Sequence, residues 1–160
     1  MLPRIRGVAF EWVYASPALL LQLTLMHCPK LQSIYAKALI AHPCSAERPW
    51  RIVIGFDEFA PGSQLSVDNA RKAMNAYYNF LELGSRVLTQ DSTWFVICSV
   101  RHERMIQVIG GWSHMLGILL QRMFLDQGGF SRGVQVMLLG KRYVIFAKLS
   151  NILSDGDGLR

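Results

Sequence analysis

The sequence predicts a domain of the α/β (α+β) class, in which helices flank a mixed sheet of three to four strands. Short apolar runs rich in β-branched residues, typical of buried strands, alternate along the chain with longer segments of helical periodicity. The chain has 160 residues, of which 51% are hydrophobic and 18% charged. This length and composition suffice for one packed domain and exclude an intrinsically disordered chain.

The first 49 residues predict a helical lead-in, and residues 50–160 form the predicted α/β domain. Ser16 and Pro17 are typical of a helix start, because serine caps the first turn and proline fits its first position. Pro29 begins a second helix, whose apolar spacing ends before Pro43.

Strands and helices then alternate through the rest of the chain. The run 51–56 predicts a buried strand that ends at Asp57 and Glu58. Ser66 and Gly84 bound a predicted helix with apolar residues at three-to-four spacing. The remaining elements are a strand at 93–100, a helix at 112–125, and two strands, 134–139 and 142–148, about a tight turn.

Charge and cysteine content restrict the partners and the compartment. The formal net charge is +6 with a pI near 9.6, which favours a polyanionic partner such as DNA. The three cysteines form no Cys-x-x-Cys motif, so we expect a reducing, intracellular location, with the nucleus as the candidate compartment. The apolar runs are too short to span a bilayer, and no membrane partner is expected.

Acidic residues after apolar runs are the candidate catalytic and metal-binding groups. Asp57 follows the first strand, and strand alternation allows only Asp57 or Glu58 to face the site; we favour Asp57. Asp155 and Asp157 follow a later apolar run, and carboxylates from two strands can hold Mg²⁺ or Mn²⁺. The alternatives are a solvated strand end at Asp57 and an Asp-Gly turn at Asp155.

Basic residues in the second half of the chain are the candidate nucleic-acid contacts. On a shared face they would bind phosphates, and otherwise they form an ordinary solvated surface. The candidates are Arg101, Arg104, Arg132, Lys141 and Arg142.

Five segments carry a resemblance to a known group: 50–62, 68–72, 80–84, 110–114 and 145–158. Across most of its length the chain resembles uncharacterised transposon-derived protist proteins. Those proteins are similar in layout to DDE transposases of the Kyakuja–Dileera–Zisupton and Plavaka type. The shared order is a strand with an acid, an inserted helix, further strands and a second acid.

This resemblance implies a partial RNase H-like core with Asp57 as the first acid and Asp155 or Asp157 as the second. In such enzymes Mg²⁺ or Mn²⁺ ions activate a water or a 3′ hydroxyl during DNA strand cleavage and transfer. The family pattern continues with a Cys/His knuckle and a third acid, so we expect a truncated domain that is inactive as it stands. The alternative is a non-catalytic α/β binding or scaffolding module of unknown partner.

Overall fold

The structure is a computed structural model of the chain, in which a four-stranded mixed sheet is the central element. A separate pair of two-residue strands, β1 (Arg4–Ile5) and β2 (Val8–Ala9), lies near the N-terminus. The residues that the structure describes are 4–5, 8–9, 11–59 and 72–154.

The central sheet has the strand order β5-β4-β3-β8. Its first three strands along the chain are β3 (Trp50–Phe59), β4 (Ala73–Phe80) and β5 (Phe95–Arg101). Strand β4 pairs antiparallel with β3 on one edge and with β5 on the other. The last strand, β8 (Ala147–Ser154), lies along the other edge of β3 and is parallel to it. The predicted mixed sheet with flanking helices is therefore confirmed.

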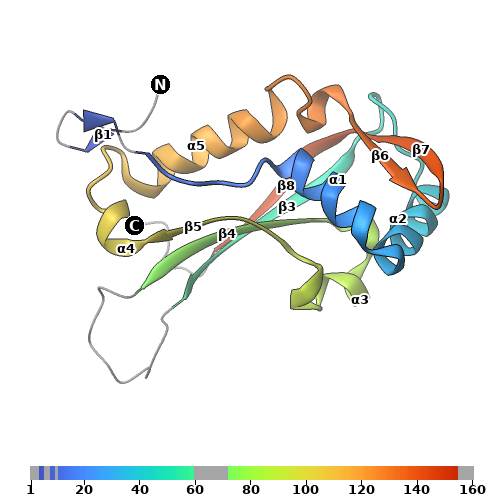
Figure 1. Ribbon diagram of the computed structural model, residues 1–160, viewed down its shortest axis with the longest axis horizontal. Helices are drawn as coiled ribbons and strands as arrows, with labels where there is room; N and C mark the ends of the chain where they lie inside the picture. Colours follow the sequence, from blue (N-terminus) through green and yellow to red (C-terminus); the bar gives the residue numbers. More distant parts are fainter. Residues whose placement is uncertain (1–3, 6–7, 10, 60–71, 155–160) are drawn as a thin grey trace.

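Helices cover one face of this sheet. The lead-in helices α1 (Pro17–His27) and α2 (Pro29–Ala41) begin at the two prolines, as the sequence predicts. Figure 1 shows α1 on the same side of the sheet as α5 (Gly111–Phe124), whereas α3 (Ser85–Leu88) lies on the other side. No helix in the described part of the chain is both long and apolar enough to cross a membrane.

Short elements complete the described chain. The hairpin of β6 (Val134–Leu138) and β7 (Lys141–Ile145) confirms the strand pair predicted there, except that the second strand ends at Ile145 and the predicted residues 147–148 belong to β8. Its turn has positive φ at Leu139 and Gly140, as a two-residue hairpin requires. The other short elements are α4 (His102–Met105) and the 3₁₀ turns η2 (Leu81–Leu83), η3 (Asp91–Thr93) and η4 (Phe130–Arg132).

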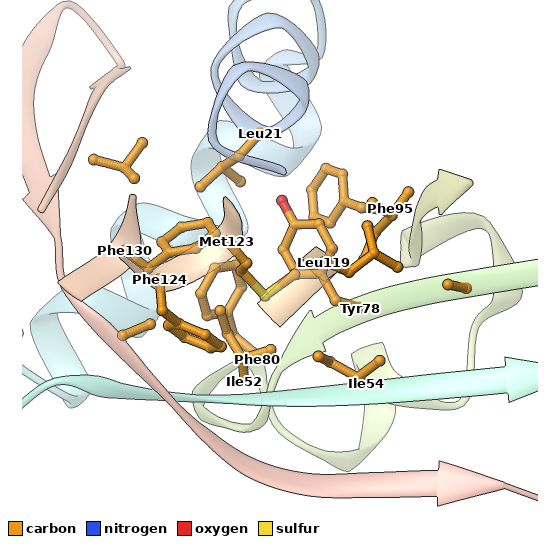
Figure 2. Packing of buried hydrophobic residues seen from close by; sticks show 14 of the residues in the cluster. Leu21, Ile52, Ile54, Tyr78, Phe80, Phe95, Leu119, Met123, Phe124 and Phe130 are labelled. Carbon is orange, nitrogen blue, oxygen red and sulfur yellow. The ribbon is translucent and has the colours of Figure 1, made fainter. Parts of the chain in front are cut away.

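Aromatic side chains fill the space between the sheet and its helices. Alternate residues of β4, among them Tyr78 and Phe80, point to this side and are fully buried. Figure 2 shows both rings with Phe130, below Leu21 of α1. The Tyr78 hydroxyl donates a hydrogen bond of 2.7 Å to the Pro17 carbonyl, which satisfies its one polar group. The lead-in and the sheet thus share one core.

The prediction of a helix between Ser66 and Gly84 is wrong for the second half of that segment. Ala73–Phe80 is strand β4, and residues 60–71, which include the expected cap at Ser66, lie outside the described residues. The apolar residues of this segment satisfy both periodicities, because alternate positions from Met74 to Phe80 are buried. Pairing with β3 on one edge and β5 on the other favours the strand, since the sheet buries these aromatic residues.

Gly55 leaves room for the ring of Tyr77 against β3. A Cβ atom at Gly55 would overlap the ring of Tyr77 on the facing strand. We expect Gly55→Ala to lower the free energy of unfolding by about 1–3 kcal/mol, because the ring must move from its packed position. Urea denaturation measures this change.

Gly117 provides the matched control for that substitution. It is an exposed position within α5, and apart from the backbone of its own helix no described atom lies within 4 Å of an added Cβ. Gly117→Ala should therefore raise the free energy of unfolding by about 0.5–1 kcal/mol, since alanine favours the helix. Equal effects of the two substitutions would contradict the proposed crowding at Gly55.

Candidate functional site

The face of the sheet turned away from α5 carries Asp57. Along β3, Ile52, Ile54 and Phe56 belong to the buried core, so Asp57 points to the opposite face and is exposed. Paired residues of adjacent strands share a face. Asp57 pairs with Asn75 of β4, which pairs in turn with Ser99 of β5. These three polar residues form one row across the sheet, which we call the polar row.

A cavity of about 430 Å³ lies beside the polar row on the same face. The rings of Tyr77 and Trp94 meet edge to face in its wall, with centroids 5.3 Å apart. Asp57 and Asp91 both line this cavity, and each is exposed to solvent. Carboxylate oxygens are the ligands that Mg²⁺ and Mn²⁺ prefer, so this pair fits the predicted metal in its chemistry.

Glu58 points to the other face, where Lys72 and His102 lie near its carboxylate. Lys72 Nζ lies 3.3 Å from Glu58 Oε2, and His102 Nδ1 lies 3.9 Å from Glu58 Oε1. The Glu58 carboxylate therefore already has a counter-ion at Lys72. Asp57 makes no such pair among the described residues, which leaves it as the acid of β3 available to a metal.

The parallel strand β8 leads toward Asp57. Its last paired residue, Ser154, lies opposite Phe56, which directly precedes Asp57. Asp155 and Asp157 follow Ser154 in the sequence but lie outside the described residues. Among the described residues, no three His, Cys, Asp or Glu side chains are grouped so as to hold a metal ion.

The basic residues proposed to bind nucleic acid fall into separate places. Arg101 at the end of β5 and Arg104 on α4 line one cavity of about 420 Å³. Lys141 and Arg142 lie on β7, at the opposite end of the molecule from α4 (Figure 1), and Arg132 lies on η4, which leads into β6. The structure thus brings two of the five together and places the other three elsewhere.

Several residues of these cavities have no signal in the sequence. These residues are Trp12, Ser99 and Asp91. Their positions in the cavities depend on strand register or on a turn, neither of which can be derived from local sequence spacing. Three aromatic residues, Trp94, Trp112 and Phe124, differ in their burial. Trp112 and Phe124 are buried, whereas Trp94 is half-buried and lines the cavity beside Asp57.

Burial removes Cys98 from the candidate nucleophiles. It raises the pKa of the Cys98 thiol to about 12, so the thiolate is scarce at neutral pH. We expect iodoacetamide at pH near 8, about the ordinary thiol range, to leave Cys98 unmodified in the folded protein. Peptide mass spectrometry measures the modification at each cysteine.

Cys28 is the internal control for this experiment, because its side chain is half-exposed. Alkylation should reach Cys28 first and reach Cys98 only after urea unfolds the protein. Rapid alkylation of Cys98 in the folded protein would contradict its burial.

No model of a known protein family matches the chain, and no curated protein sequence matches it. A function is therefore proposed from the arrangement of the described residues. The relevant features are Asp57 at the end of the β3–β8 pair, the polar row, and the two cavities that flank this row.

Proposed function

We propose that this chain is part of a transposase-like, RNase H-like domain that processes DNA with the help of Mg²⁺ or Mn²⁺. The parallel register of β3 with β8 carries this proposal. In this register Ser154, which precedes Asp155 in the sequence, pairs with Phe56, the residue before Asp57. An acid on the first strand of a sheet, beside a later strand that precedes a second acid, is the layout implied by the resemblance.

The proposed metal-binding residues are Asp57 together with Asp155 or Asp157. When bound, a divalent cation polarises a phosphate oxygen and lowers the pKa of a water or hydroxyl ligand. The exposed carboxylate of Asp57 supplies negative charge for this cation, and the adjacent cavity leaves room for a phosphate group. Asp91, on the wall of the same cavity, is available as a further carboxylate.

The net charge of +6 supports DNA as the partner. The proposal for this chain covers binding of the metal ion and of DNA. A nuclear location follows from DNA as the partner.

Asp57→Asn tests the metal site directly. We expect it to weaken Mn²⁺ binding by about tenfold or more, because it removes the charge of a proposed ligand and keeps its shape. Isothermal titration with MnCl₂ measures the affinity, and circular dichroism checks that the variant is folded. Asp155→Asn should weaken binding in the same direction.

Glu47→Gln is the matched control, since Glu47 is exposed and precedes β3, at the end of the strand opposite Asp57. It removes one negative charge and should leave Mn²⁺ affinity unchanged. If Asp57→Asn also leaves the affinity unchanged, or if the parent chain binds no Mn²⁺, the metal proposal is wrong. A non-catalytic binding module then becomes the better account.

A further inference from the structure

The N-terminal segment forms a second cavity where it runs along the free edge of β5. Tyr14 bridges to Cys98, and the Ala15 amide donates a hydrogen bond of 2.7 Å to the Ile97 carbonyl. This pairing brings Trp12 to the end of β5, where it lines the cavity of about 420 Å³ with Arg101 and other residues. The remaining lining residues are Val13, Ser99, Val100, Glu103 and Arg104.

The ring of Trp12 is held in place but remains accessible. It is half-buried and packs against the edge of the main hydrophobic core. Its ring centroid lies 5.5 Å from that of Tyr14, at an interplanar angle of 33°. An indole supported from behind in this way needs little further ordering to stack on a flat ligand.

The charge of this cavity favours an anion. Arg101 pairs with Glu103 at 3.6 Å, but both side chains are largely exposed and such a pair is weak. No carboxylate in the described part of the chain lies within ion-pair distance of Arg104. A phosphate can therefore bind Arg104 and also compete with Glu103 for Arg101.

We infer that this cavity binds one nucleotide of a single-stranded nucleic acid, with the base against Trp12 and the phosphates against Arg101 and Arg104. This inference rests on the proposed function for its choice of polymer. Aromatic stacking combined with arginine contacts to the backbone is how proteins hold single strands without reading their sequence. A concave cavity receives an unpaired base, whereas a duplex keeps its bases stacked inside.

The polar row joins this cavity to Asp57. Ser99 lines the cavity and is separated from Asp57 by the single strand β4, with Asn75 between them. Two steps between adjacent strands span roughly 10 Å. The polar row thus lies between the Ser99 side of this cavity and the carboxylate of Asp57.

Fluorescence anisotropy with a labelled oligo(dT) of about ten nucleotides tests the inference in EDTA, where no divalent metal contributes. Trp12→Ala should weaken binding about tenfold, and Trp12→Phe should restore most of it, because a ring is enough for stacking. Arg104→Gln should reduce the slope of log K against log salt by about one, as expected when one phosphate contact is lost.

Arg48→Gln is the matched control: Arg48 is exposed, lies before β3, and loses the same charge. The inference is overturned if the chain does not bind the oligonucleotide, or if Arg48→Gln weakens binding as much as Arg104→Gln. If Trp12→Ala fails to fold, the salt slope of Arg104→Gln decides the question. Oligonucleotide binding is measured in EDTA and Mn²⁺ affinity is measured without the oligonucleotide, so failure of this inference is distinct from failure of the metal proposal.

Discussion

The parallel pairing of β3 with β8 is the contact on which the rest of the structure depends. A parallel pair cannot be closed by a short turn, so the chain between these strands must return to the end of the sheet at which β3 starts before β8 begins. That crossover contains β4, β5, α5 and the β6–β7 hairpin. Pairing on both edges makes β3 an inner strand of the sheet, and its residues from Ile52 to Phe56 are buried. The same pairing aligns the end of β8 with the residue before Asp57.

The spacing of apolar residues was sufficient to predict an element where it fits either a helix or a strand but not both. Strand β5, helix α5, the two lead-in helices and the β6–β7 hairpin lie close to their predicted positions. Strand β4 was not predictable in this way, because its apolar residues fit a helical face as well as a strand face. Asn79 shows what decides between them: its side chain is buried and donates to the Thr93 hydroxyl and carbonyl, contacts that the turn before β5 supplies.

The candidate site was predictable only in part for a similar reason. Asp57 could be identified because an acid directly after an apolar run is a local feature of the sequence, although the strand does not end there as predicted: β3 continues through Asp57 and Glu58 to Phe59. Asn75 and Ser99 became its neighbours through the register of two strand pairs, which local sequence spacing does not encode. The basic residues show the same limit. Their number was evident from the sequence, but the separation of Arg101 and Arg104 from the residues of β7 depends on the fold.

The lead-in segment connects stability to the proposed function. An exposed edge strand invites pairing with other chains, and residues near Tyr14 and Ala15 occupy part of the β5 edge. The same segment supplies Trp12 to the cavity, while α1 and α2 bury Leu21 and Tyr35 in the shared core. A fragment that began at residue 50 would lose part of its core and one wall of the nucleotide cavity, and it would expose the edge of β5. The lead-in is therefore part of the unit that folds and, under the proposal, of the surface that binds DNA.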